Sequence, residues 1–324
     1  METLIKMFRK KVADEPFATV LDANVAFLEF LKATENKNDI DSYEKLSELA
    51  LSIISEHAYY QRLEDGSYEL TQQYLMEGIS GSLEKIEVPK ELLALIEDNA
   101  DALNSLIYEE ISAMGMSVRI DESVDFAEFI KHCLSRNLKS GMETGIVCFG
   151  FGETEKLPSM LHTTIDGDFD NVIRCWRESH NDMNKPSSPK SIINTFAQAD
   201  MVKLFMEGIS PDIFSALVDS MNEHVDEEIM TKVFDSFHDE ILTRSVIPIV
   251  NSVRLLPKEE MAIIAESLVD LTSLRRKMDS DVRTVGGPVD VAVISKGDGF
   301  IWLKRKHYFD PALNPDFATR KGRS

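Results

Sequence analysis

Residues 286–309 restrict the possible fold more than any other stretch, because they predict a β-hairpin directly after a long helix. Three valines alternate with other side chains over residues 289–294, and residues 300–306 return with aromatic and β-branched side chains. Between them, Lys296-Gly297-Asp298-Gly299 is typical of a tight turn. A two-stranded ribbon is only marginally stable in water. At least one more strand and a covering helix must therefore come from elsewhere in the chain or from a partner.

The first part of the chain is predicted to be helical. Apolar residues at helical spacing predict two amphipathic helices over residues 2–13 and 17–33. The first of them begins at Met1 without an N-cap residue, from which we expect that an upstream segment is missing. An acidic region without a regular repeat follows over residues 41–136, with helices predicted at 43–60, 70–79, 89–114 and 123–137.

The pattern changes to strands at Thr144. Residues 145–152 are expected to form a buried strand that begins the sheet for the hairpin, followed by strands over 159–165 and 172–177. Asp166-Gly167-Asp168 is expected to turn the chain between two of these strands. Helices are then predicted at 195–207, ended by Gly208, and at 211–223, 226–245 and 257–278. Strands and helices in separate runs predict the α+β class, with a flexible tail over 311–324.

Charge and cysteine content exclude several classes of protein. The chain has 35 basic and 56 acidic residues, and its net charge of -21 disfavours nucleic acid and anionic membrane surfaces as partners. No apolar run is long enough to span a bilayer, and the N-terminus does not resemble a signal peptide, so we expect a cytoplasmic protein. Cys133, Cys148 and Cys175 are too few and too widely spaced for a disulfide framework or a zinc site, and they are expected to be reduced thiols.

Three short segments, taken together, resemble the proteasome-type subunits of the N-terminal-nucleophile hydrolase superfamily. The segments are residues 146–159, which include Ile-Val-Cys-Phe-Gly-Phe-Gly-Glu, residues 196–202, and the helix from Met261 leading into Val285-Gly286-Gly287-Pro288. Residues 1–9 and 297–309 further resemble parts of a bacterial group of proteasome-like proteins. The resemblance covers residues 1–33 and about 144–310, so residues 41–136 are interpreted as a helical insertion.

This resemblance implies an αββα sandwich that is incomplete at its N-terminal strands. Active members of the superfamily use an N-terminal Thr, Ser or Cys with an Asp and a Lys on early strands, and these have no matching positions here. The free α-amine of such a residue can act as the base for its own side chain, whereas Met1 offers only a thioether. Two supporting positions before the Gly-Gly pair carry Val282 and Val285, although Asp281 lies one residue away.

Other candidate sites are explained better without a chemical role. Gly145, Gly150 and Gly152 lack the following helix that a phosphate-binding loop requires, so close backbone packing is expected there. Ser159, His162 and Asp166 lie too close together along the chain to form a catalytic triad. Solvated charge explains His180 with Asp182, and the cluster at residues 223–228, better than a metal site does.

One patch remains open to two interpretations. Lys304, Arg305 and Lys306, together with Trp302, His307 and Tyr308, form a basic aromatic patch that either protects a sheet edge against aggregation or faces a partner subunit or a carboxylate ligand.

We therefore predict no catalytic, cofactor-binding or metal-binding residues, and no cofactor. The first hypothesis is a non-catalytic proteasome-like subunit or fragment with a structural or interaction role, completed by a partner chain or by homo-oligomerisation. The alternative is an amide hydrolase or peptidase of threonine type whose nucleophile lies upstream of Met1. A third hypothesis is a helical scaffold in which residues 41–136 bind a partner.

Overall fold

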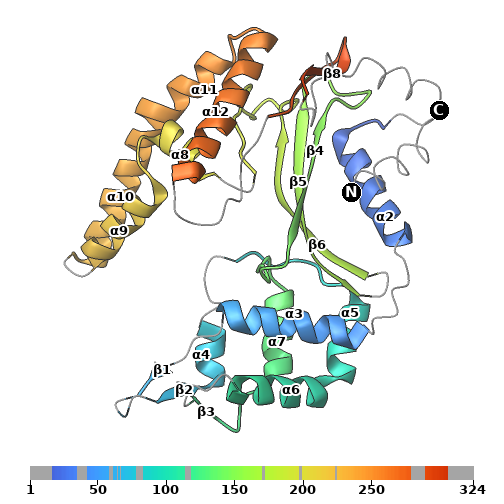
Figure 1. Ribbon diagram of the computed structural model, residues 1–324, viewed down its shortest axis with the longest axis vertical. Helices are drawn as coiled ribbons and strands as arrows, with labels where there is room; N and C mark the ends of the chain where they lie inside the picture. The colour runs from blue at the N-terminus through green and yellow to red at the C-terminus, as the bar shows by residue number, and fades with distance from the viewer. Residues whose placement is uncertain are drawn as a thin grey trace. The chain divides into compact units, whose positions relative to one another are not determined.

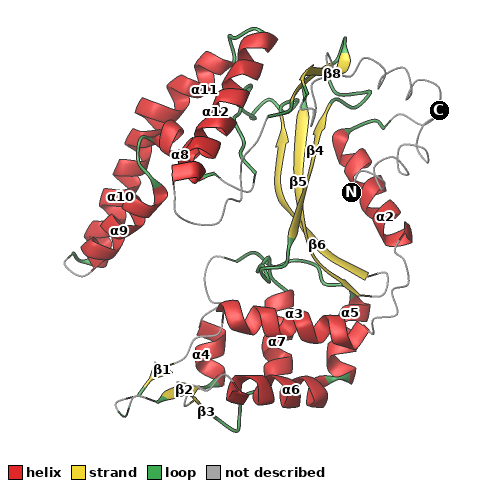
Figure 2. Ribbon diagram, viewed as in Figure 1, coloured by secondary structure: helices red, strands yellow, loops and turns green. Residues whose placement is uncertain are grey.

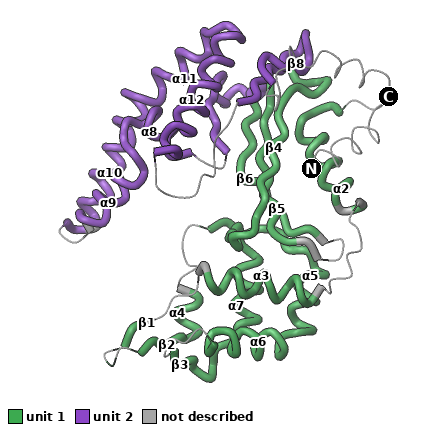
Figure 3. Tube along the Cα trace, in the orientation of Figure 1, with its two compact units in different colours: residues 1–182 green, residues 183–324 purple. Residues whose placement is uncertain are grey.

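The computed structural model describes residues 17–34, 42–57, 61–63, 65, 67–77, 83–113, 118–169, 172–196, 199–222, 225–278 and 289–305. Their helices and strands are segregated along the chain, which confirms the α+β class (Figure 2). The chain divides into two compact units, residues 1–182 (unit 1) and residues 183–324 (unit 2) (Figure 3). The boundary lies inside the stretch 144–310, which the sequence predicted as one body. The predicted helix at 2–13 and the tail at 311–324 lie outside the described residues.

A helical subdomain with its own core occupies residues 42–138 of unit 1 (Figure 1). Its core residues recur at helical spacing, for example Leu46, Leu49 and Ile53 on one helix, and all three are almost fully buried. The stretch predicted as one helix at 89–114 is two helices that meet at Asn99. Asn99 caps the first helix, because its side-chain amide donates to the Leu95 carbonyl at 2.8 Å. The helices are α3 (Ser42–His57), α4 (Gln72–Glu77), α5 (Lys90–Asp98), α6 (Ala100–Ala113) and α7 (Phe126–Leu134).

Three short strands in this subdomain were not predicted from the sequence. Strand β1 (Gln61–Arg62) pairs antiparallel with β2 (Tyr68–Leu70), which pairs parallel with β3 (Val118–Ile120). Two or three residues are too few to show an alternation of apolar and polar side chains, so their periodicity carries no signal.

The larger sheet of unit 1 is an antiparallel meander in the order β4-β5-β6, with bounds Thr144–Gly150, Ser159–Phe169 and Val172–Asp182. Helix α2 (Val20–Thr34) packs against β4 and β5 (Figure 1). Thr19 and Asp22 cap α2 reciprocally, because each backbone amide donates to the other residue's side chain. A Cβ atom at Gly152 would lie 2.2 Å from the Ala18 carbonyl oxygen, which confirms the predicted close backbone approach.

Two predictions about these strands are wrong. Strand β4 is not buried: it is an edge strand in which only Gly150 is buried, and Phe149 is 57% exposed. Asp166-Gly167-Asp168 is not a turn, because β5 continues to Phe169 and the pairing with β6 shifts between Ile165 and Asp168. Gly167 adopts a φ of 111° at this bulge, a conformation that glycine reaches without strain.

Unit 2 contains a set of amphipathic helices followed by the hairpin. Gly208 ends α8 in the left-handed conformation, as predicted, although this helix begins five residues later than expected. The helix predicted at 226–245 continues to Val253 through a π-helical turn, in which the Ile247 amide donates to the Leu242 carbonyl. Pro248 has no amide hydrogen to donate to the carbonyl four residues back, which favours this wider turn. The helices are α8 (Asp200–Glu207), α9 (Pro211–Asn222), α10 (Glu227–Ile241), η1 (Leu242–Val246), α11 (Ile247–Val253) and α12 (Lys258–Met278).

The predicted hairpin is present in unit 2. Strands β7 (Val291–Ser295) and β8 (Gly299–Lys304) pair antiparallel around the expected turn, and within the described residues they pair only with each other. Two ion pairs hold the hairpin to α12: Lys258 to Asp298 at 2.7 Å, and Glu266 to Lys304. None of the described helices is both long and apolar enough to cross a membrane.

Candidate functional site

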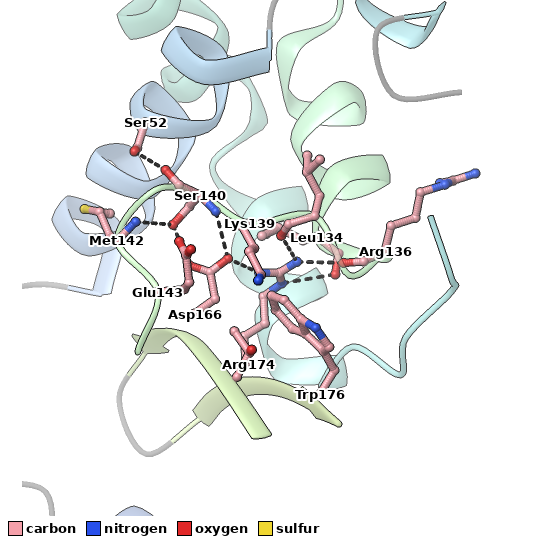
Figure 4. A network of polar contacts seen from close by, with 12 residues as sticks. Ser52, Leu134, Arg136, Lys139, Ser140, Met142, Glu143, Asp166, Arg174 and Trp176 are labelled. Carbon is pink, nitrogen blue, oxygen red and sulfur yellow. Dashed lines mark hydrogen bonds and ion pairs between the residues drawn. The ribbon is translucent and has the colours of Figure 1, made fainter. Parts of the chain in front are cut away.

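The most densely connected group of polar side chains lies where α7 meets the sheet of unit 1 (Figure 4). Asp166 comes from the bulge in β5 and Arg174 from β6, and the two side chains form an ion pair through Oδ2 and Nη1. Both side chains are 0% exposed. The pair therefore has no contact with bulk water, and its charges must be satisfied by the protein itself.

Arg174 also binds the end of α7. Its Nε donates to the Leu134 carbonyl at 3.2 Å, and its Nη2 donates to the carbonyls of Arg136 at 2.7 Å and Leu138 at 2.9 Å. The last carbonyls of a helix have no partner within the helix, and a cation there also interacts favourably with the helix dipole. One guanidinium thus satisfies the end of a helix and fixes its position against the sheet.

Asp166 binds the connection between α7 and β4. It accepts hydrogen bonds from the backbone amide of Ser140, at 3.1 Å, and from the Ser140 hydroxyl. The Ser140 hydroxyl oxygen accepts in turn from the Met142 amide at 3.2 Å, and Ser52 on α3 donates to the Ser140 carbonyl. The network therefore joins α3, α7, β5 and β6 through side chains that lie far apart in the sequence.

Burial shifts the pKa of two groups in and beside this network, the Arg174 guanidinium and the Cys133 thiol. Burial lowers the pKa of the Arg174 guanidinium, while the adjacent Asp166 carboxylate opposes that change. The Trp176 ring lies 4.6 Å from the Arg174 Cζ atom and adds a cation–π contact. Burial raises the pKa of the Cys133 thiol to about 12, so this cysteine is a neutral thiol at physiological pH.

This arrangement joins parts of the fold and is not suited to catalysis. A catalytic serine needs a base that accepts its proton and a path for the substrate. The Ser140 hydroxyl instead donates to a carboxylate that is already paired with arginine, and Ser140 itself is fully buried. The network holds the end of α7 and the connection that follows it in place against the sheet.

The residues considered for a triad are not brought together. The Ser159 hydroxyl lies 2.7 Å from a Glu155 oxygen and 3.2 Å from an Asp182 oxygen. The His162 ring lies against Gly145 on the neighbouring strand, and Asp166 belongs to the network with Ser140 and Arg174. The buried Glu155 also accepts from the amides of Gly152 and Val20, so this group stabilises the packing of α2 on the sheet.

The other residues considered have separate surroundings. The three cysteines form no disulfide, and Cys148 accepts a hydrogen bond from Asn24 at 3.5 Å. In the part of the chain that the structure describes, no three His, Cys, Asp or Glu side chains lie close enough to hold a metal ion. At 223–228, Asp226 caps α10 by accepting from the Glu228 amide. Residues 281, 282, 285 and 306–308 lie outside the described residues.

A small pocket of about 230 Å³ lies between α8, α9, α10 and η1 within unit 2. Its lining is mainly apolar and includes Phe214, whose ring stacks on that of Phe237 at a centroid distance of 6.1 Å. Lys203, Glu207 and His238 supply its charged and titratable groups. Neither a hydroxyl nor a thiol side chain occurs among its lining residues, all of which are described.

The sequence did not indicate that Arg174 and Ser140 belong to a buried network, and it placed Asp166 in a predicted turn. One available signal was an arginine among the apolar and aromatic residues 172–176, because a charged residue within a buried part of a strand needs a partner. The partners themselves come from other elements, and no local pattern identifies them.

Comparisons of the chain with protein-family models, with curated proteins and with solved structures found no match. The resemblance to proteasome-type subunits therefore rests on the sequence segments alone and stays a prediction.

Proposed function

We propose that this chain is a non-catalytic subunit of the proteasome-like, N-terminal-nucleophile-hydrolase type, and that it acts in the cytoplasm by associating with other chains. The observation that supports association best is the exposed apolar surface of unit 2. Among the described residues of this unit, only three hydrophobic side chains are buried: Val202, Leu268 and Val291. A folded unit of this size normally buries a much larger core.

The helices of unit 2 present their apolar residues to solvent in large numbers. Exposed apolar patches of this kind mark surfaces that contact other proteins. The exposed large hydrophobic residues on α8 to α12 are Phe205, Ile213, Leu217, Ile229, Val233, Phe237, Ile247, Met261, Ile263, Val269, Leu271, Leu274 and Met278.

Open sheet edges support the same proposal. In the described residues β4 and β6 are the outer strands of a three-stranded sheet, and β7 and β8 form a two-stranded one. Such edges carry unpaired backbone groups that pair readily with another strand. The absence of nucleic acid and membrane from the proposed partners rests on the net charge of -21.

The buried network supports a role without catalysis. Ser140, Asp166 and Arg174 bind one another in unit 1, and each side chain also forms hydrogen bonds with backbone groups. Ser159, His162 and Asp166 have different partners, so they do not supply an alternative site.

The test is to purify the protein from its native source and measure its mass under native and denaturing conditions. We expect an assembly that contains this chain at 36.6 kDa and no peptidase or amidase activity. A monomer in the native sample would contradict the proposal. A heavier chain with Thr, Ser or Cys at its N-terminus would instead favour the hydrolase hypothesis.

A further inference from the structure

Strand β8 carries apolar side chains on both of its faces, and this pattern determines what can cover it. Phe300 and Trp302 lie on one face and Ile301 on the other, since side chains alternate along a strand, while Leu303 is the extra residue of a bulge between the pairs Ala292–Trp302 and Val291–Lys304. All four side chains are between 43% and 50% exposed. Continuous apolar runs are typical of strands that are buried on both faces inside a larger sheet.

The outer edge of β8 is unpaired within the described residues. Its inner edge pairs with β7, for example Ile301 with Val293, and α12 packs on β7. The outer edge therefore offers backbone donors and acceptors next to four exposed apolar side chains. Helix α12 supports the ribbon at β7, and a third strand beside β8 would support its other side.

The charges at the two ends of β8 are opposite. Asp298 lies just before the strand, while Lys304 and Arg305 lie at its end. Asp298 pairs with Lys258 and Lys304 with Glu266 within the chain, but the Asp298 and Lys304 side chains stay 54% and 56% exposed, so each can take a second ionic partner. An antiparallel copy of the same strand places the acidic start of one beside the basic end of the other, with the apolar centres together. The sequence of β8 is thus complementary to itself in the antiparallel direction only.

We propose that β8 pairs antiparallel with β8 of a second copy of this chain around a twofold axis at Ile301. In this register Ile301 faces its own copy, Phe300 faces the partner's Trp302, and Asp298 faces the partner's Lys304. Aromatic and opposite-charge pairs facing each other across strands stabilise a sheet. The product is a four-stranded antiparallel sheet, and twofold dimers are the most frequent closed assemblies. This inference rests on the proposed function and names the partner as a second copy.

The first experiment measures the mass of the recombinant full chain by light scattering over a range of concentrations. We expect a dimer of twice 36.6 kDa. Ile301→Lys places two ammonium groups opposite each other at the axis, and it should raise the dimer dissociation constant at least tenfold. Val25→Lys is the matched control, because Val25 is also a β-branched apolar residue of similar exposure, 48%, but lies on α2 of unit 1. It should leave the dimer intact, and circular dichroism should show both variants folded.

The second experiment tests the direction and register of pairing. Ile301→Cys should form an intermolecular disulfide under mild oxidation, because the two Cβ atoms face each other at about 5 Å. Leu303→Cys replaces a side chain of similar exposure on the same strand, but antiparallel pairing separates its two copies by roughly 14 Å, beyond disulfide reach. The chain with only its three native cysteines gives the background.

Three results would overturn the inference: a monomer at all concentrations, a dimer unaffected by Ile301→Lys, or equal cross-linking at 301 and 303. A recombinant monomer together with a native assembly would refute self-pairing and leave the proposed function standing, with a different chain as the partner. A monomer in both samples would refute both proposals.

Discussion

The contribution of the buried network to the unfolding free energy depends on the Arg174 guanidinium, which makes the ion pair and three of the hydrogen bonds. Replacing Arg174 with Met would leave the Asp166 carboxylate without its counter-ion and three carbonyls without their donor. Breaking a buried pair in this way typically costs about 3–5 kcal/mol of unfolding free energy. Urea denaturation followed by circular dichroism measures the change.

Arg177→Met is the matched control for this substitution, because Arg177 is exposed on the same strand. It should change the unfolding free energy by no more than about 0.5 kcal/mol. Equal effects of the two substitutions would mean that the Arg174 contacts contribute nothing to stability.

A second residue-scale prediction concerns acid stability. Partial burial would raise the pKa of Glu178, but hydrogen bonds from Lys139, Thr164 and Trp176 outweigh that effect and lower the pKa below the ordinary glutamate value of 4.5. A carboxyl whose pKa is lower in the folded state stabilises the protein above its unfolded pKa, and this stabilisation is lost as the pH falls through the folded pKa. Glu178→Gln should therefore lower stability at pH 7 and flatten the loss of stability below pH 4.5. Unfolding curves between pH 3 and 7 measure this slope, and the exposed Glu110→Gln should leave it unchanged.

At the residue scale the sequence predicts caps and turns better than buried polar partners. The role of Gly208 is confirmed, because a helix end is decided by neighbouring residues. Asp166 was noticed, but its partners Ser140 and Arg174 are set by tertiary packing. An Asp-Gly-Asp sequence suits both a turn and a bulge, and only the buried ion pair decides between them.

At the scale of elements, the periodicity of apolar residues predicts the position of a helix or strand well where the element is long. Helix α12 and the hairpin β7–β8 follow the predicted bounds closely. The failures occur where one position changes the hydrogen-bonding pattern: Asn99 divides a helix in two, and the π-turn before Pro248 joins two others. Strand β4 reads as buried because its residues are apolar, and the position of a strand within its sheet is not encoded locally.

The connection between α7 and β4 gives a prediction about an element. Residues 137–141 lie outside any helix or strand, yet Ser140 is fully buried and bound by Asp166 and Ser52. Proteases cut backbone that can leave the fold, so this connection should resist limited proteolysis in the wild-type protein. In Arg174→Met the same connection should be cut, because its anchors are lost. Mass spectrometry of the fragments locates the cuts, and wild-type cleavage at 137–141 would contradict the prediction.

At the scale of the whole molecule, the two units differ in how they are stabilised. Unit 1 contains nearly all of the buried hydrophobic residues in the described parts of the chain, including the closed core of residues 46–138. Unit 2 has three, together with the exposed strand β8. Since buried apolar area is the main favourable contribution to folding, we expect unit 2 to be much less stable than unit 1 when it has no partner.

The two tryptophans allow this difference to be measured, because one lies in each unit. Trp176 is 6% exposed in unit 1, and Trp302 is 46% exposed in unit 2. With Trp302→Phe, fluorescence reports unit 1 alone, and with Trp176→Phe it reports unit 2 alone. We expect unit 2 to unfold at a lower urea concentration. Coincident transitions from the two probes would show one cooperative body instead.

Protein concentration connects this unfolding experiment to the pairing of β8. An association that involves only the folded form raises its apparent stability as the concentration rises. The Trp302 transition should therefore move to higher urea with increasing protein concentration, while the Trp176 transition stays fixed. Ile301→Lys should remove the concentration dependence, and Val25→Lys should retain it. If the Trp302 transition is independent of concentration in the wild-type chain, unit 2 gains no stability from a second copy, and the self-pairing of β8 is refuted.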